Sequence, residues 1–274
     1  HTNAAAVMVT ATGAGGGART AVAVAVLLFV SDSALVVEAT PVIVVVAVTK
    51  YAEADQIRAL IQLGHRDFGE NKVQNLITRV AMIEEFMTRR KVLPHAGHHA
   101  GGPMDTAIRW HMIGHLQRNK AKKAVELCRL IHSVDSLRLA EESQSVATKR
   151  AEPVDVLVQV NCSGEKSKFG CPPPAALHLA EQIDTMLTVR VRGLMTMAAL
   201  DAGPGEVRET FGRCHELFDE VKKTGEGEGK FDILSMGMSG DFEAAIAEGA
   251  NMVRVGSAIF GEPKITDQLE EEEE

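Results

Sequence analysis

A lysine stands at the end of the most apolar stretch of this 274-residue chain, where its amine could do covalent chemistry. The stretch VIVVVAV runs from Val42 to Val48 and is followed by Thr49 and Lys50. An ammonium at the edge of a buried strand is partly desolvated, and desolvation lowers the pKa of a lysine and frees its lone pair. Such an amine attacks carbonyl groups and forms a Schiff base. The alternative is a lysine whose side chain simply extends from the strand end into water.

Two stretches rich in glycine and serine, near the C-terminal end, could bind an anion. SMGMSGD contains Ser239 and precedes a helical pattern, and RVGSAIFG supplies Arg254, Gly256 and Ser257. Backbone N–H groups at the start of a helix, together with a serine hydroxyl, suit a phosphate. The alternative is two ordinary turns, in which Gly and Ser are common. A Schiff-base lysine and a phosphate site together favour a phosphorylated aldehyde, and pyridoxal phosphate is such a molecule.

The elements that hold these groups follow from hydrophobic periodicity. Apolar runs of strand length alternate with amphipathic helical patterns, which predicts parallel strands joined by right-handed crossovers. Eight such units in about 250 residues predict an α/β fold, a single (β/α)8 TIM barrel, with an open doubly wound sheet as the alternative. No GxGxxG follows the first strand. The strands are expected at residues 42–49, 66–68, 108–113, 130–134, 154–160, 189–196, 232–236 and 252–256.

The C-terminal ends of barrel strands face the active site, so residues there are the candidates for function. Lys50 follows the first predicted strand, and both glycine-serine stretches follow the last two. Glu70 and Asn71 follow the second strand and are expected at the barrel mouth. The spacing therefore predicts one site, built from several strand ends.

Three segments are expected along the chain. The first segment, residues 1–40, diverges in composition from the rest of the chain and is expected to form a packed helix or strand. Its apolar run AVAVAVLLFV is shorter than the ~20 residues needed to span a bilayer, and a signal or transit peptide is the alternative. The second segment, residues 41–264, is the barrel, and the third, residues 265–274, is an acidic tail.

Composition excludes several classes of protein. The formal net charge is −8, and no basic cluster with interleaved aromatic residues occurs, which argues against a nucleic-acid-binding protein. The four cysteines lie far apart and predict free thiols in a reducing compartment, hence the cytoplasm, with mitochondrial targeting as the alternative. His95, His98 and His99 lack acidic or cysteine neighbours, so a loop at 94–105 is expected there instead of a metal site. No membrane association is expected.

Seven stretches of the chain resemble, in order, the blocks of the pyridoxal phosphate homeostasis protein family. Members of that family are similar to the barrel domain of alanine racemase standing alone. The resemblance covers roughly Val42 to Gly261 and leaves out the first forty residues. The stretches are AVTK, FGENKVQN, WHMIGHLQRNK, VNCSGEKSKFG, RGLMTM, SMGMSGDFEAAIAEG and VRVGSAIFG.

The resemblance implies a cofactor site for pyridoxal 5'-phosphate. It implies that Lys50 carries the cofactor as a Schiff base and that the loops after the last two strands hold the phosphate. Arg254 is implied near the cofactor, either at the pyridine nitrogen, which we favour, or at the phosphate. An arginine at the nitrogen keeps it unprotonated and weakens the electron sink. The implied set is Ser239, Gly256 and Ser257 at the phosphate, Ser235 and Met238 nearby, and Asn71 and His111 at the other edge of the ring, where hydrogen-bonded barrel-mouth residues are the alternative.

Three functions compete for such a site: a carrier of pyridoxal phosphate, a pyridoxal phosphate-dependent racemase or decarboxylase, and a Schiff-base aldolase. A racemase of this fold uses a tyrosine from an extra β domain as its second base. The only tyrosine here, Tyr51, adjoins Lys50 and points to the opposite face, and the chain ends soon after the last strand. An aldolase would need groups such as Glu70 and Lys168 beside the amine, which nothing in the sequence supports.

We therefore expect a protein of vitamin B6 homeostasis that buffers and delivers the cofactor without robust catalysis. We expect no catalytic residues, and the runner-up is the racemase or decarboxylase. The expected partners are the cofactor and apo forms of pyridoxal phosphate enzymes. The protein itself is expected to be a monomer or a weak dimer.

Overall fold

The computed structural model of the chain describes residues 8–11, 22–25, 42–92, 107–150, 152–165, 168–225 and 227–262. The loop predicted at 94–105 with its three histidines, the acidic tail at 265–274, and most of the segment 1–40 lie outside the described residues.

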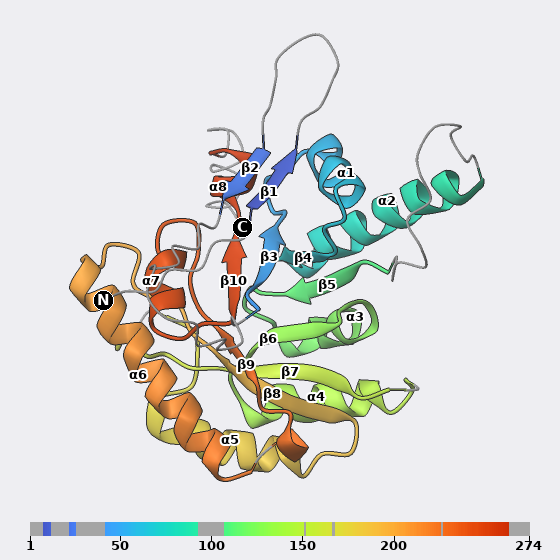
Figure 1. Cartoon of the computed structure of the whole chain (residues 1–274). Coiled ribbons are helices and arrows are strands. Elements are labelled where there is room, and N and C mark those ends of the chain that lie inside the picture. The colour runs from blue at the N-terminus through green and yellow to red at the C-terminus, as the bar shows by residue number, and fades with distance from the viewer. Residues whose placement is uncertain are drawn as a thin grey trace, which may run out of the picture.

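Within the described residues, eight parallel strands close into one barrel, in the order β10-β3-β4-β5-β6-β7-β8-β9 (Figure 1). The predicted (β/α)8 fold is confirmed, and each predicted strand range overlaps an observed strand. These strands are buried on both faces, which explains their nearly continuous apolar sequences. Their bounds are β3 (Val44–Val48), β4 (Asp67–Glu70), β5 (Arg109–Met112), β6 (Leu130–Val134), β7 (Val154–Gln159), β8 (Val189–Met195), β9 (Ile233–Ser235) and β10 (Met252–Val255).

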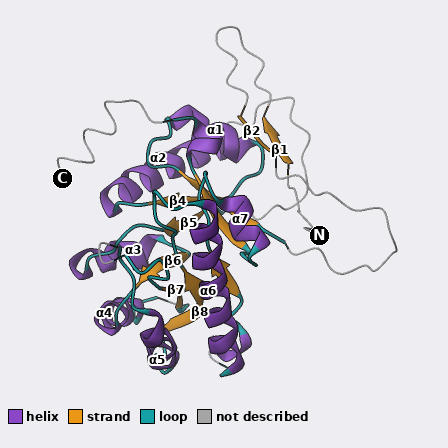
Figure 2. Cartoon of the chain, turned by 90° about the vertical axis from the view of Figure 1, so that its left-hand side faces the viewer, coloured by secondary structure: helices purple, strands orange, loops and turns teal. Residues whose placement is uncertain are grey.

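Helices cover the outside of the barrel (Figure 2). The helices are α1 (Ala54–Gln62), α2 (Val73–Val92), α3 (Ala121–Leu127), α4 (Leu137–Ala147), α5 (Pro173–Asp184), α6 (Pro204–Lys223), α7 (Phe242–Ala247) and α8 (Ser257–Phe260), with 3-10 turns η1 (Arg118–Lys120) and η2 (Gly227–Gly229).

Two separate apolar clusters reflect the alternation of side chains along the strands. The larger one lies between strands and helices and includes Phe68 and Trp110. The smaller one fills the barrel interior, where its buried members come from five strands. Because successive strand residues point to opposite faces, every second residue of a strand joins the interior. The interior members are Val46, Leu130, Leu157, Met195 and Met252.

A short antiparallel pair precedes the barrel. β1 (Met8–Ala11) pairs with β2 (Val22–Ala25), with Met8 opposite Ala25. β2 belongs to the apolar run of the N-terminal segment and contacts α8. Among the helices that the structure describes, none has the length and apolar character needed to cross a membrane.

Candidate functional site

Lys50 lies two residues after the end of β3, on the register that points into the barrel. It lies four residues after Val46, a member of the interior cluster, so the period of two places its side chain at the mouth. Its Nζ lies 4.4 Å from the centroid of the Tyr51 ring. The turn is closed by the Ala52 N–H, which donates to the Thr49 carbonyl at 3.0 Å. The strand end therefore presents the amine at the rim of the barrel.

The turn that carries Lys50 is fastened from outside the barrel by two charged residues. Thr49 Oγ1 donates to Glu70 Oε1 at 2.6 Å, and Arg79 of α2 donates to the Ala52 carbonyl at 2.7 Å. Arg79 Nε also lies 3.7 Å from Glu70 Oε1. These contacts hold the backbone on both sides of the lysine, so the amine starts from a fixed position.

Glu70 does not lie at the mouth, where we expected it. Its side chain is fully buried and shares the outward register of Phe68, so it faces α2 instead of the barrel interior. Burial raises the pKa of Glu70, and the hydrogen bond from Thr49 and the nearby Arg79 only partly offset this effect. Strand alternation explains the difference, since Asn71, one residue later, takes the inward register.

The loops after β9 and β10 converge on one hydroxyl. Ser239 Oγ accepts hydrogen bonds from the backbone N–H groups of Gly256 at 3.1 Å and Ala258 at 3.3 Å. Gly237 enables the first loop to turn, because its φ of +88° is in the left-handed region that favours glycine. The two stretches singled out as an anion site are thus brought together.

These loops lie beside the strand that carries Lys50. β10 pairs with β3 in parallel, with Arg254 opposite Val46. A Cβ atom added to Gly256 would lie 3.4 Å from Val48 Cβ. Gly256 therefore lies next to Val48, which precedes Lys50 by two residues. The amine and the anion-type loops therefore occupy neighbouring positions at one end of the barrel.

Arg254 is a buried cation inside the barrel. Its side chain is 3% exposed; Nη1 donates to Ser235 Oγ at 2.7 Å and Nη2 donates to the Thr196 carbonyl at 3.0 Å. Burial lowers the pKa of Arg254 to about 10, which leaves it charged at neutral pH. Among the residues that the structure describes, no carboxylate lies within ion-pair distance of it. Its direct protein partners are therefore neutral.

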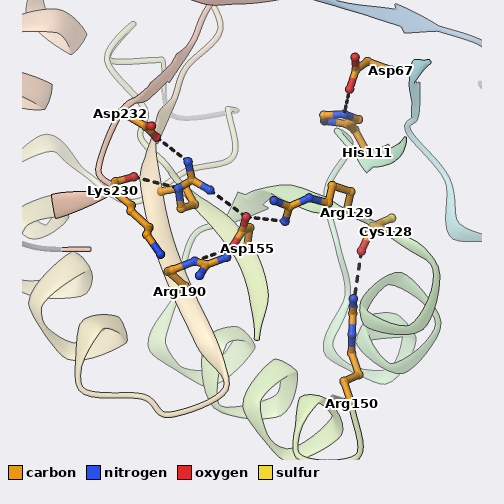
Figure 3. Close-up of polar contacts among 10 residues, drawn as sticks. Asp67, His111, Cys128, Arg129, Arg150, Asp155, Arg190, Lys230 and Asp232 are labelled. Carbon is orange, nitrogen blue, oxygen red and sulfur yellow. Dashed lines mark hydrogen bonds and ion pairs between the residues drawn. The ribbon is translucent and has the colours of Figure 1, made fainter. Parts of the chain in front are cut away.

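Ser235 and His111 face the barrel interior. Ser235 Oγ bonds Arg254 and lies 3.0 Å from His132 Nδ1, and His111 bonds His132 and Asp67. Figure 3 shows His111 pointing toward Asp67. Within the part of the chain that the structure describes, neither side chain bonds the Ser239 loop, so both belong with Arg254. Sequence reasoning missed His132, although its register with Leu130 would have placed it inside.

The remaining predicted residues lie around the rim. Asn71 follows β4 and is partly exposed, and a Cβ on Gly114 would lie 2.1 Å from its carbonyl oxygen, so only glycine fits opposite it. Met238 and Ser257 are partly exposed in the loops after β9 and β10. The Met238 N–H donates to Asp241 Oδ1 at 2.5 Å, which ties that loop to the start of α7.

The residues present fit a ligand that combines an aldehyde, an aromatic ring and a phosphate. The amine of Lys50 suits the aldehyde, and the hydroxyl and N–H groups gathered at Ser239 suit the phosphate. The cation of Arg254, deeper in the barrel, suits a ring nitrogen that accepts a hydrogen bond.

Comparison with known proteins agrees with this geometry. Residues 35–263 match the family model of the alanine racemase N-terminal domain. The pyridoxal phosphate homeostasis protein of Helicobacter pylori is 36% identical over 223 residues, which cover 81% of this chain and 88% of the relative. The protein of the same name from Aquifex aeolicus is 38% identical over 216 residues, covering 79% and 85%.

Solved structures give the same assignment. PipY of Synechococcus elongatus with PLP bound is 31% identical, with a TM-score of 0.65, and the match covers 82% of this chain and 95% of PipY. An alanine racemase of Clostridium difficile, 14% identical with a TM-score of 0.60, shares the fold alone. The matches span nearly the whole barrel, and the chain therefore belongs to the pyridoxal phosphate homeostasis protein family, within the alanine racemase N-terminal domain fold.

Proposed function

We propose that this protein binds pyridoxal 5'-phosphate through a Schiff base to Lys50. The observation that carries the proposal is the pairing of β10 with β3, which sets the lysine beside the loops that meet at Ser239. When bound, the cofactor supplies an electron-withdrawing ring. Lys50 provides the amine, and Ser239, Gly256 and Ser257 hold the phosphate.

The remaining predicted residues orient the ring in this proposal. Arg254 donates to the pyridine nitrogen, and Asn71 lines the ring from the other side of the mouth. Ser235, Met238 and His111 support these groups from behind. A donor at the nitrogen keeps that atom unprotonated, so the site binds the cofactor while weakening its use as an electron sink.

We propose that the physiological role is buffering and delivery of the cofactor to apo-enzymes in the cytoplasm, without robust catalysis. The chain has one tyrosine, and the ring of Tyr51 lies under the Nζ of its own neighbour, Lys50, at 4.4 Å. A two-base racemase needs an acid–base group on the far side of the cofactor from the lysine. The names of the relatives in Helicobacter and Aquifex support a role in homeostasis.

The decisive experiment maps the covalent link. Purified protein incubated with pyridoxal 5'-phosphate should turn yellow, and borohydride reduction should leave one labelled lysine, Lys50, in a peptide mass map. The Lys50→Ala variant should be colourless after dialysis. The exposed Lys123, which pairs with Glu126, provides the control: Lys123→Ala should keep the colour. A label on another lysine would refute the assignment.

A turnover assay separates the carrier from the runner-up enzyme. The holoprotein should show no sustained racemisation or decarboxylation across a panel of L-amino acids. Turnover at the usual enzymatic range of about 1 to 1,000 per second would decide for a racemase or decarboxylase.

A further inference from the structure

A continuous chain of hydrogen bonds crosses the barrel interior from Asp67 to Arg254. His111 Nε2 lies 3.1 Å from Asp67 Oδ1, and His111 Nδ1 lies 2.9 Å from His132 Nε2. His132 Nδ1 lies 3.0 Å from Ser235 Oγ, which accepts from Arg254 Nη1 at 2.7 Å. Four bonds thus join a carboxylate and a guanidinium contributed by β4 and β10.

The carboxylate end of the chain can only accept hydrogen bonds. Asp67 accepts two bonds from Arg109, at 2.8 and 2.7 Å. Burial by itself would raise the pKa of Asp67, but the hydrogen bonds from Arg109 and His111 hold it well below its usual range. Asp67 is therefore ionised at neutral pH, and His111 must present Nε2–H to it.

The direction of the other bonds follows step by step. A neutral His111 with its proton on Nε2 has an acceptor at Nδ1, so His132 must donate from Nε2. His132 then has an acceptor at Nδ1, to which the Ser235 hydroxyl donates. The oxygen of Ser235 is left to accept from Arg254. Every donor in this arrangement has one acceptor, and all four bonds point from the guanidinium toward the carboxylate.

The competing arrangement is less favourable. If His111 carried two protons, it would donate to His132 as well, and His132 would donate to Ser235. Ser235 would then accept from both His132 and Arg254, and its own buried proton would have no acceptor among the described contacts. It would also place a second cation inside the barrel with Arg254. Burial, together with the charge of nearby Arg254, lowers the pKa of His132 well below its usual value, so that residue stays neutral.

We infer that His132 and His111 are positioning residues that fix the guanidinium of Arg254, through Ser235, for its contact with the ring nitrogen of the cofactor. The ring-nitrogen contact itself rests on the proposed function. The geometry requires this support because, within the described residues, Arg254 donates to two protein partners, Ser235 Oγ and the Thr196 carbonyl. Without the acceptor at His132 Nδ1, the Ser235 hydroxyl can rotate and donate its hydrogen bond to a different acceptor.

The chain of hydrogen bonds from Asp67 to Arg254, called the relay below, is first tested in the apoprotein, where cofactor binding plays no part. Nitrogen-15 spectra of the histidines at neutral pH should show both His111 and His132 as neutral rings with the proton on Nε2. Assignment uses His111→Asn and His132→Asn, each of which removes one set of signals. A doubly protonated His111, or a His132 with its proton on Nδ1, would overturn the inference.

The positioning role is tested in the holoprotein with a pair of variants at His132. Leucine removes both bonds, whereas asparagine keeps an oxygen near the position of Nδ1 and so keeps an acceptor for Ser235. His132→Leu should weaken retention of pyridoxal 5'-phosphate about tenfold and shift its visible absorption band, and His132→Asn should restore both most of the way. Equal effects of the two variants would refute the role.

A neighbouring serine provides the matched control. Ser133 is on the same strand and also fully buried, but its hydroxyl has no hydrogen-bond partner within the described structure. Ser133→Ala should leave the band and the affinity unchanged. A shift equal to that of His132→Leu would mean that any change in β6 has this effect. If His132→Leu does not fold, the tautomers in the apoprotein spectra still decide whether the directed hydrogen bonds exist.

The two proposals fail in different ways. A protein that keeps the predicted tautomers but never binds the aldehyde would refute the proposed function and leave the hydrogen-bond relay standing. A protein that forms the yellow Schiff base on Lys50 but has other histidine tautomers would refute the relay and leave the proposed function standing.

Discussion

The barrel holds two arginine systems that differ in their partners, one around the buried carboxylate of Asp155 and one at the buried Arg254. Near the start of β7, Asp155 accepts hydrogen bonds from Arg129 at 2.5 Å and Arg190 at 2.8 Å (Figure 3), and from Arg192 at 3.0 Å. On β10, Arg254 bonds a serine hydroxyl and a backbone carbonyl. The first system pairs charge directly, and the second does not.

This difference indicates different roles for the two ends of the barrel. A guanidinium whose donors are used by a carboxylate is neutralised and serves the fold. A buried guanidinium with neutral partners keeps an uncompensated charge, which costs stability unless a ligand uses it. In barrels of this kind the N-terminal end serves stability and the C-terminal end serves function, and these arginines follow that division.

The largest expected effect is on the Asp155 system. Asp155→Ala leaves three arginines without their shared carboxylate, so the free energy of unfolding should fall by about 3 kcal/mol in urea titrations. The affinity of the folded variant for pyridoxal 5'-phosphate should stay within about twofold, because the carboxylate is not part of the proposed site.

The matched control is Asp232, which pairs with Arg192 at 2.8 Å but is 55% exposed. Asp232→Ala should cost less than about 1 kcal/mol, since exposed ion pairs contribute little. If Asp155→Ala instead abolished cofactor binding in a folded protein, the proposed division between the two ends would be wrong.

Replacement of Arg254 should have the opposite pattern. Arg254→Gln removes the cation but keeps an amide donor for Ser235, so the fold should persist while cofactor affinity falls about tenfold, or ~1.4 kcal/mol. Equilibrium dialysis and urea unfolding of the same samples measure the two quantities. An unchanged affinity would contradict the proposed contact.

A smaller effect is expected at Asp67, which belongs to the relay. This effect appears as a pH dependence of the free energy of unfolding. Its folded pKa is depressed, so its stabilising contribution is complete above the unfolded value of about 3.9 and is lost progressively as the pH falls from there toward the lower folded pKa. Asp67→Asn should therefore lower the free energy of unfolding by about 1 kcal/mol near pH 7. Urea titrations from pH 7 to pH 3 should show the two proteins converging in acid; a constant difference would argue against an ionised Asp67.

Much of the fold could be predicted because it depends on local patterns. The eight strands were located from apolar runs, and the four cysteines are free thiols, as predicted. Lys50 and Ser239 could be placed at one end of the barrel because both follow a strand, and the chain order of strands in a barrel sets their neighbours. Glu70 was predicted on the wrong face of its strand, because a shift of one residue along a strand moves a side chain from the barrel interior to the helix side.

The amino-acid sequence by itself determined the barrel, the lysine at the end of β3 and the two loops that meet at Ser239, because hydrophobic period and strand order act over short stretches of chain. Only the tertiary structure decided that His132 meets both His111 and Ser235, residues 21 and 103 positions away. Those contacts exist because the closed barrel points alternate side chains of distant strands into one interior, where most buried polar groups form hydrogen bonds with one another.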